Sequence, residues 1–523
     1  MIDEGDFRSD GHESPPDEPI MDSIHRLIAD TSRGRPAAGE LTAALFAVAT
    51  DAALARKAMD VLAATPTIWL DVDLAARRRH PPLTLHDLAR HEHLPPYAGP
   101  LLALALAACV WNGRERERVV GHPLMRTEPV LLPVLLIRTA DWVRAVRERA
   151  LKALAGALAN ADLMALLTAV PMAVRLARRT RATPALDLVR AALLRADDDT
   201  LNGLLRTDQV TLQDPQARRF VYDVLLQAGR LDHAMLTRAA LHEPDQLART
   251  RCAHTLASQA VEHARPELAA AILDGASAQG RVQALTALVR LGHTEHGPRH
   301  LDDNAGMVRL TAQWAVRRAG GDPTALYRAR LAMGGDPESR QVTRGLLAGL
   351  GDCGTRDDAA LVLPYLRHPR PRVRAEAVRT LRRLDARTDL TTLLEDPAPV
   401  VVRNVVTTLL TSGPAVPVEH LWTLLTPARP RHVRQAAHRL LAARDAWSRV
   451  KADLLLLRDP DEKLRARARG DLTIWCRTDS VTAYPRACPP EARTELEALI
   501  HAAGPLLGTE NARLLRLSLQ LSR

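Results

Sequence analysis

Histidine–glutamate pairs are the first residues in this sequence whose types could do chemistry, because both side chains can bind a metal ion. Such pairs occur at His12-Glu13, His91-Glu92 and His242-Glu243. His91 and His93 lie on either side of Glu92 in a proline-flanked segment, and a zinc site there would need one or two more ligands that the sequence does not indicate. We therefore predict solvated loop histidines and no metal site.

Cysteine chemistry is the next possibility. The five cysteines lie far apart, their number is odd, and no Cys-x-x-Cys pair occurs among Cys109, Cys252, Cys353, Cys476 and Cys488. This spacing argues against a zinc ribbon and against a disulfide framework. We predict buried thiols, as in a cytoplasmic protein.

The sequence contains no phosphate-binding loop that follows an expected strand and no motif that activates a nucleophile. It contains no Gly-x-x-x-x-Gly-Lys-[Ser/Thr] loop and no Gly-x-Ser-x-Gly motif. The glycines at 320–321, 334–335 and 349–354 lie between expected helices, where glycine commonly ends a helix. The sequence therefore indicates no cofactor and no catalytic residue, and nothing in it argues for an enzyme.

Arginine is the chemically interesting residue that recurs. A polar residue, often Asp, is followed after about five residues by Val-Arg-x-x-Ala-x-x-x-Leu. The arginines of this motif are Arg147, Arg218, Arg249, Arg281, Arg309, Arg374, Arg403, Arg434 and Arg465. From Arg218 onward their spacings are 31, 32, 28, 65, 29, 31 and 31 residues, and a degenerate copy lies in the interval of 65. A period near 31 predicts stacked helical hairpins.

The repeated unit contains the elements that such a hairpin needs. In the clearest copy Val373, Ala377 and Leu381 lie on one face of a helix that begins near residue 371. Short apolar stretches upstream supply a first helix, and Asp-Pro turns at 214–215, 336–337, 396–397 and 459–460 connect the two helices. One hairpin cannot bury its apolar face alone, so neighbouring hairpins must stack. The interval between Arg147 and Arg218 is expected to hold two irregular units.

The unit resembles the HEAT repeat, in the short bacterial form also called the PBS-lyase HEAT-like repeat. Good copies cover about residues 140–475. The resemblance implies an all-α fold, a right-handed α-solenoid superhelix of HEAT-like helical hairpins without a β-sheet. HEAT-like hydroxylases hold two irons with repeated His-Glu pairs, but only His242-Glu243 falls within a repeat here. The same solenoid serves scaffolds, nucleic-acid binders and lyases, so the fold alone does not give the function.

Charge divides the chain. Residues 1–30 contain nine acids and two arginines, whereas the whole chain has a net charge of +10. We predict a disordered acidic tail over 1–20, an irregular helical region over 21–130, a HEAT-repeat solenoid over 131–480 and a helical cap over 481–523. The acidic start is the reverse of a signal peptide, and the apolar run from Pro100 to Trp111 is too short to span a membrane. We therefore expect a cytoplasmic protein.

The repeat arginines flank the buried face, where an unpaired charge would be costly. Each is therefore expected to contact a turn Asp or carbonyl oxygens of the adjacent repeat. A second basic set occupies positions −2, +2, +5 and +9 from these arginines, on the side of the helix away from the core. We call this set the basic stripe: Arg149, Lys152, Arg251, Arg290, Arg318, Arg372, Arg379, Arg383, Arg439, Lys463 and Arg467.

Acids are rare at the positions of the basic stripe, where only Asp223 and Glu376 occur. We expect reversal of Arg379, Arg383 and Arg439 to leave folding almost unchanged. The first hypothesis for function is a non-catalytic scaffold that binds a protein partner, possibly acidic, along a basic concave surface. The alternatives are nucleic-acid binding, resembling DNA-alkylation-repeat proteins, and a HEAT-like lyase or other enzyme subunit. Aromatic residues form only 3% of the chain, which argues against base stacking.

Overall fold

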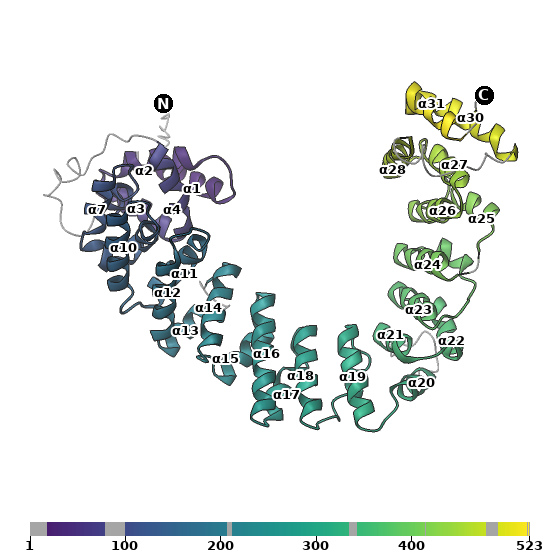
Figure 1. The fold of residues 1–523 in the computed structure, drawn as a ribbon, viewed down its shortest axis with the longest axis horizontal. Coiled ribbons are helices and arrows are strands. Elements are labelled where there is room, and N and C mark those ends of the chain that lie inside the picture. Colours follow the sequence, from purple (N-terminus) through teal and green to yellow (C-terminus); the bar gives the residue numbers. More distant parts are fainter. Residues whose placement is uncertain are drawn as a thin grey trace, which may run out of the picture. The chain divides into compact units, whose positions relative to one another are not determined.

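The structure is a computed structural model that describes residues 18–78, 100–206, 212–333, 343–413, 415–476, 490–519 and 521. Every regular element in these residues is a helix, and they contain no strand, which confirms the predicted all-α repeat fold (Figure 1). The predicted tail lies outside the described residues except for its last three, which begin α1 (Glu18–Ser32). His12-Glu13, His91-Glu92-His93, the Asp-Pro turn at 336–337 and Cys488 also lie outside them.

The chain forms two compact units, Met1–Gly280 and Arg281–Arg523. The division therefore falls within the region predicted as one solenoid. No helix in the described segments is long and apolar enough to cross a membrane.

The first unit begins with helices that do not follow the Val-Arg pattern. After α1 these are α2 (Ala38–Val48), α3 (Ala52–Ala63), α4 (Trp69–Arg78), α6 (Pro100–Ala107), α7 (Gly113–Val120) and α8 (Leu124–Thr127). Hairpins then follow as pairs: α9 (Leu132–Thr139) with α10 (Arg144–Ala157), α11 (Leu163–Leu176) with α12 (Thr183–Arg195), α13 (Asp198–Leu205) with α14 (Pro215–Gln227), and α15 (His233–His242) with α16 (Gln246–Glu262). The interval from Arg147 to Arg218 thus holds one additional hairpin, α11 with α12, and not the two units predicted. The last helix before the division is α17 (Pro266–Leu273), and α18 (Ala278–Arg290) crosses it.

The second unit continues the pattern. Its elements are η3 (Pro298–His300) with α19 (Gly306–Arg318), α20 (Pro323–Met333) with α21 (Arg344–Cys353), α22 (Ala359–Val362) and η5 (Leu363–Arg367) with α23 (Pro371–Arg383), η6 (Thr391–Glu395) with α24 (Pro399–Thr411), α25 (Val418–Leu424) with α26 (Arg431–Arg444), and α27 (Ala446–Leu456) with α28 (Glu462–Ile474). Two helices end the chain, α30 (Pro490–Leu507) and α31 (Thr509–Ser518). Within this unit the second helices α23, α24 and α26 form one row and the first helices α22 and α25 form another (Figure 1).

The predicted apolar face forms the core. Val373 is 3% exposed, and Ala377 and Leu381 are fully buried. Further along the second unit, one hydrophobic cluster begins with Ala375 and Val378 of the same helix and extends to Leu521. Because each hairpin covers the apolar face of the next, the core extends along the stack and not around a single centre.

The Asp-Pro turns act as predicted within the described residues. The Asp214 carboxylate accepts a hydrogen bond from the Gln216 N–H at 2.8 Å and so caps α14. Asp396 and Asp459 likewise accept from the backbone N–H two residues further on, at 2.8 and 2.7 Å. The Asp214 cap fixes where α14 begins, whereas Asp396 and Asp459 hold the turns that lead to the N-cap residues Ala398 of α24 and Asp461 of α28.

Candidate partner-binding surface

The fourth residue of most second helices is an arginine that joins its repeat to the next. Arg374 in α23 donates from Nε and Nη2 to the two carboxylate oxygens of Asp396, at 2.7 and 2.8 Å. Its Nη1 donates to the carbonyl oxygen of His368 at 2.8 Å. A bidentate pair with a carboxylate is among the strongest polar contacts that arginine makes.

Five arginines that are the fourth residue of a described helix form such bidentate pairs, with distances of 2.7 to 3.0 Å. The pairs are Arg116–Asp141, Arg218–Glu243, Arg281–Asp303, Arg374–Asp396 and Arg434–Asp459, and we call them the arginine ladder. In each pair the acid lies in the turn before the next second helix. This confirms the structural role predicted for the repeat arginines. Burial would raise the pKa of Asp141 and Asp303, but their bonds to arginine and to a backbone N–H outweigh burial and hold the pKa below its usual value.

Arg116 was not found by the sequence analysis, because its helix lacks the Val-Arg motif. The residue is 1% exposed and donates to the carbonyl oxygens of Val110 and Trp111 as well as to Asp141. Its separation from the acid, 25 residues, equals that in Arg218–Glu243 and Arg434–Asp459, and this spacing could have revealed it. The repeat contact therefore begins before residue 131.

The remaining repeat arginines make other contacts. Arg147, Arg249 and Arg465 donate to the carbonyl oxygen six residues earlier, at 2.7, 2.5 and 2.6 Å. Arg309 pairs with Asp352 of α21 at 2.8 Å.

Arg403 is a correction to the predicted register. α24 begins at Pro399, so its fourth residue is Val402, which is 2% exposed. Arg403 is one position further on, about 100° around the helix, and is exposed. The turn before α26 (426–430) contains no acid, so no ladder contact could form at this repeat.

Five members of the basic stripe are paired with acids. Arg149 lies 3.5 Å from Glu117, Arg379 lies 3.0 Å from Glu376, Arg383 lies 3.3 Å from Asp352, Arg467 lies 3.4 Å from Asp471, and Arg251 pairs with Asp223. Because the acid neutralises each of these charges, they contribute little to a positive surface.

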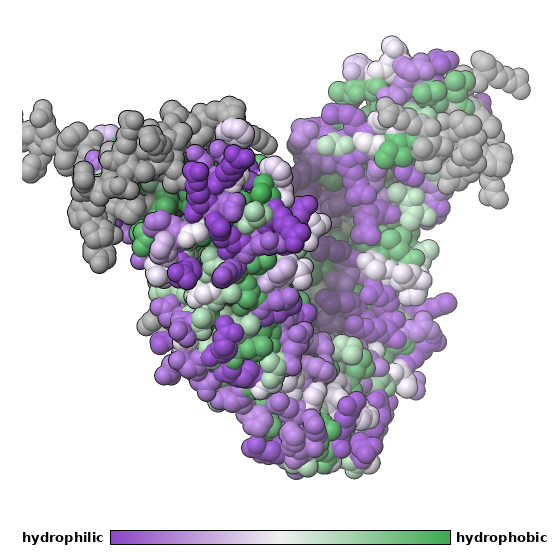
Figure 2. Space-filling view, turned by 60° about the vertical axis from the view of Figure 1, so that its left-hand side comes forward, coloured by the Kyte–Doolittle hydropathy of each residue, from purple (hydrophilic) through white to green (hydrophobic). Residues whose placement is uncertain are grey.

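Six members make no side-chain ion pair or hydrogen bond with any described residue. They are Lys152 in α10, Arg290 in α18, Arg318 in α19, Arg372 in α23, Arg439 in α26 and Lys463 in α28. All six are on second helices, and all except the half-buried Arg439 are exposed. They are the part of the stripe that is available to a partner. In the space-filling view hydrophilic residues cover most of the visible face, with hydrophobic patches between them (Figure 2).

Glu376 was expected on the outward side but is 2% exposed. Arg379, Arg344 and Arg383 lie 3.0, 4.0 and 3.7 Å from its carboxylate. Contacts from the neighbouring helix α21 thus turn this position into a buried ionic network. Reversing Arg379 and Arg383 would leave a buried acid among like charges, and we now expect that change to destabilise the fold.

A small groove between α24 and α26 combines free basic side chains with an apolar floor. Its volume is about 110 Å³, and it is lined by Pro399, Val402, Arg403, Val406, His432, Gln435, Ala436 and Arg439. No acid lines it. Arg403 and Arg439 make no ion pair in the described structure, and the His432 ring nitrogen Nε2 lies 2.9 Å from the carbonyl oxygen of Asp396. The groove can accept a carboxylate above an aliphatic surface.

A larger groove of about 430 Å³ in the first unit lies beside the His242-Glu243 pair. The Glu243 carboxylate accepts both hydrogen bonds of Arg218, each at 2.7 Å, and is 2% exposed. His242 is exposed. Because Arg218 already donates to both carboxylate oxygens of Glu243, His242 and Glu243 do not form a ligand pair for a metal.

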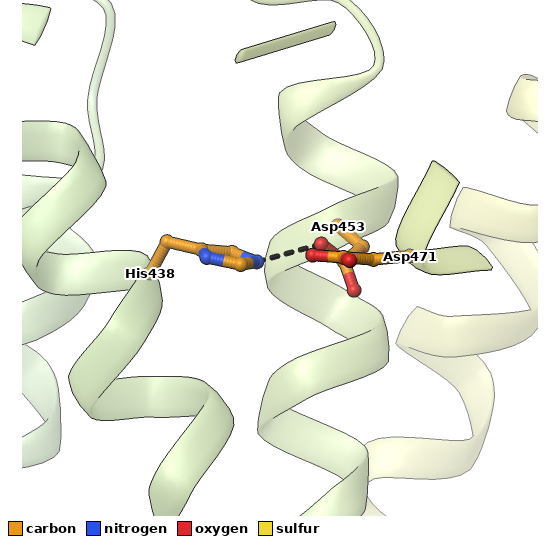
Figure 3. Close-up of side chains that lie close together, drawn as sticks. All are labelled: His438, Asp453 and Asp471. Carbon is orange, nitrogen blue, oxygen red and sulfur yellow. Dashed lines mark hydrogen bonds and ion pairs between the residues drawn. The ribbon is translucent and has the colours of Figure 1, made fainter. Parts of the chain in front are cut away.

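Three buried or half-buried residues from successive helices come together in the second unit: His438 in α26, Asp453 in α27 and Asp471 in α28 (Figure 3). Their ligand atoms all lie within 4.8 Å of one another. His438 Nε2 is 2.6 Å from Asp453 Oδ1. Two atoms bound to one ion at 2.0–2.2 Å would be roughly 3 Å apart, so the shorter contact is a hydrogen bond.

The surroundings of this cluster favour the protonated form of Asp453. Burial raises the pKa of Asp453, and the hydrogen bond from His438 only partly opposes this. Sequence reasoning missed the cluster because its members come from three helices at irregular spacing.

The family comparison agrees with this geometry. Residues 359–442, from α22 through most of α26, match the family model of HEAT repeats. Residues 359–442 are therefore similar to HEAT repeats, and they lie within an all-α helical-repeat fold. No curated protein is similar enough to match it.

Solved structures give a weaker likeness. A structure from work on a phosphorylation switch in the interaction between cadherin and beta-catenin is 15% identical, covers 80% of this chain and 98% of that one, and has a TM-score of 0.21. An engineered protein is 15% identical over 96% of this chain and 98% of its own, with a TM-score of 0.15. A mutant of Kap121p is 13% identical over 97% of this chain and 56% of its own, with a TM-score of 0.19. At such scores these structures identify no partner for this chain.

Proposed function

We propose that this chain is a non-catalytic HEAT-repeat scaffold that binds an acidic protein partner along the outward side of its second helices. The observation that carries this is the set of unpaired basic residues on second helices within the second unit, which are Arg290, Arg318, Arg372, Arg439 and Lys463. Stacked repeats present one row of helices as an extended binding surface. A positive row of this kind favours acidic partners over basic ones and speeds their encounter.

The groove between α24 and α26 is the part of this surface best suited to hold a side chain. Arg403 and Arg439 offer guanidinium groups that can bind one carboxylate. Val402 and Val406 offer apolar contact to the methylene groups of a Glu side chain. The proposed mechanism is therefore binding of acidic side chains along the second helices, with this groove as one anchoring point.

Charge reversal in the groove tests the proposal. Arg403→Glu/Arg439→Glu should fold like the wild type, because neither residue makes an ion pair in the described structure. The matched control is Arg367→Glu/Arg387→Glu, which reverses two exposed charges outside the second helices. In capture from native extract after nuclease treatment, the wild type and the control should retain the same protein, and the groove variant should lose it. Retention by all three proteins would contradict the proposal.

Nucleic-acid binding predicts a different result. Capture would then disappear with nuclease in every variant. Binding of labelled duplex DNA to the wild type would also fall steeply with salt, with a log–log slope of about −0.9 per phosphate contact. A shallow slope together with nuclease-resistant capture separates the protein scaffold from this alternative.

A further inference from the structure

Helix α19 exposes three large apolar side chains on one face. Met307, Leu310 and Trp314 are 61%, 46% and 38% exposed. Their spacing of three and then four residues places them on successive turns of the same side. We call these three residues the α19 patch.

The α19 patch does not belong to the core of the solenoid. The opposite side of the helix carries Val308, Ala312, Ala315 and Val316, all 4% exposed or less. α19 is therefore apolar on both sides, a pattern typical of a helix that is covered all round. Single exposed apolar residues are ordinary, but three on consecutive turns indicate a contact surface.

Free positive charges lie beside the patch. Arg318 follows Trp314 by four residues, on the next turn of the same face. Arg290 ends the neighbouring helix α18, which is joined to the start of α19 by the pair Arg281–Asp303. Neither Arg290 nor Arg318 pairs with an acid in the described structure.

No acidic residue offsets these charges on the two helices. α18 and α19 together contain five arginines and no Asp or Glu. Arg281 and Arg309 belong to contacts between repeats, so Arg290, Arg317 and Arg318 remain as exposed charge. The patch is therefore apolar in its centre and positive at the end where α19 terminates.

We infer that the α19 patch binds a helical segment of a protein partner that carries large apolar residues with acidic residues one turn away. This rests on the proposed function, since it names the partner chemistry for the same row of second helices. Trp and Met are effective contact residues, because Trp is enriched at binding hot spots and Met adapts to the shape opposite. Arg290 and Arg318 would pair with the carboxylates and so set the direction of the segment.

A second copy of this chain is the competing occupant. A two-fold contact would place the same surface on both sides. Arg290 and Arg318 of one copy would then approach the same residues of the other, with no acid on α18 or α19 to pair with them. Charge thus favours an acidic partner over self-association.

Three fluorescein-labelled peptides of 18 residues test the inference with the full chain. The first is helical, with Leu at i, i+3 and i+7 and Glu at i+4 and i+11; the second has Lys for Glu; the third has Ser for Leu. The wild type should bind the first at least about tenfold more tightly than either other peptide, measured by fluorescence anisotropy. Equal binding of all three peptides would overturn the inference.

Variants locate the site. Met307→Ser/Trp314→Ser should weaken binding of the first peptide about tenfold, and Arg290→Ala/Arg318→Ala should weaken it and reduce its salt dependence. The control Met164→Ser/Leu517→Ser alters side chains that are 61% and 52% exposed elsewhere and should bind like the wild type. Melting curves check that each variant folds. If the patch variant binds as the wild type does, or if the wild type is a dimer that this variant dissociates without any peptide binding, the inference is wrong.

Capture from extract separates this inference from the proposed function. If the groove variant loses its protein partner while the patch variant keeps it, the scaffold role stands and the α19 patch is not its site. If neither variant loses any protein, both proposals fail.

Discussion

Arg434 and Asp459 join two successive repeats through parallel hydrogen bonds of 2.7 and 2.8 Å, and both residues are at least 95% buried. The same carboxylate accepts the N–H of Asp461 at 2.7 Å, and the Asp459 carbonyl oxygen accepts from Arg465 at 2.6 Å. Asp459 therefore binds the arginine of the previous repeat, holds the turn that leads to the N-cap residue Asp461 of α28, and accepts from the next arginine. The fourth position of a second helix is filled in a different way in α24. There it is the buried residue Val402, and the turn before the next second helix contains no acid.

The first prediction concerns this pair. Asp459→Ala should lower the free energy of unfolding by about 3–5 kcal/mol, because it leaves the Arg434 charge buried and unpaired. Arg434→Val/Asp459→Ala should lower the free energy of unfolding clearly less than Asp459→Ala does, because it replaces the ion pair by apolar side chains, as at Val402 in α24. Thermal unfolding of both variants and the wild type measures the difference. A double variant less stable than Asp459→Ala would show that the arginine finds other partners.

The second prediction concerns the apolar face of the repeat. Leu381 is fully buried, so Leu381→Ala should destabilise the second unit by about 2–5 kcal/mol. Leu410 is 41% exposed, and Leu410→Ala serves as the control, with an expected change within about 0.5 kcal/mol. Similar melting curves for the two variants would contradict the observed packing.

The repeat period, the buried face and the structural role of the arginines could be predicted from the sequence, because each depends on local spacing along one helix. The register at Arg403 could not, since the start of α24 at Pro399 shifts the ladder position by one residue. The burial of Glu376 depends on Arg344 from the neighbouring helix. The repeat period does not show which side chains of neighbouring repeats meet when the repeats differ in length, so these contacts could not be predicted from the sequence.

The exposure of the α19 patch could not be predicted from the sequence either. Met307 and Trp314 occupy positions −2 and +5 from Arg309, which the helical period had already assigned to the outward face. The spacing places these two residues on the outward face but does not show whether another element covers them. In the described chain Met307 is 61% exposed and Trp314 is 38% exposed, so this face is left uncovered.

The third prediction is acid sensitivity of the arginine ladder. Bonds from Arg281 and a backbone N–H outweigh burial and lower the pKa of Asp303 from its ordinary value of 3.8. A lowered pKa in the folded state means that this stabilisation is present above pH 3.8 and is lost as the pH falls through the folded pKa. Asp303→Asn should therefore unfold at a lower temperature than the wild type at pH 7, and the gap should narrow on acidification. A gap that stays constant down to about pH 2.5 would show that the Asp303 charge contributes nothing.

The last prediction has the opposite sign and concerns Asp453. Burial raises the pKa of this residue above 3.8, and nearby Asp471 adds to the effect, while His438 and Arg449 oppose it. A raised pKa means that the folded chain holds the proton more tightly, so stability is greatest below pH 3.8 and decreases as the pH rises through the folded pKa. Asp453→Asn keeps a neutral polar group beside His438, so the stability of this variant should not decrease through ionisation at position 453. The melting temperature of the wild type should fall relative to that of Asp453→Asn between about pH 4 and pH 7.

The comparison is repeated with His438→Gln in both proteins, because His438 is hydrogen-bonded to Asp453 and glutamine leaves a neutral hydrogen-bonding side chain at that position. The relative fall should persist there, because desolvation of the Asp453 carboxylate causes it and not the imidazole charge. If the two His438→Gln proteins show parallel melting temperatures across the whole pH range, the pKa of Asp453 is not raised. A decrease that appears only when His438 is present would assign the pH dependence to the histidine–aspartate pair instead.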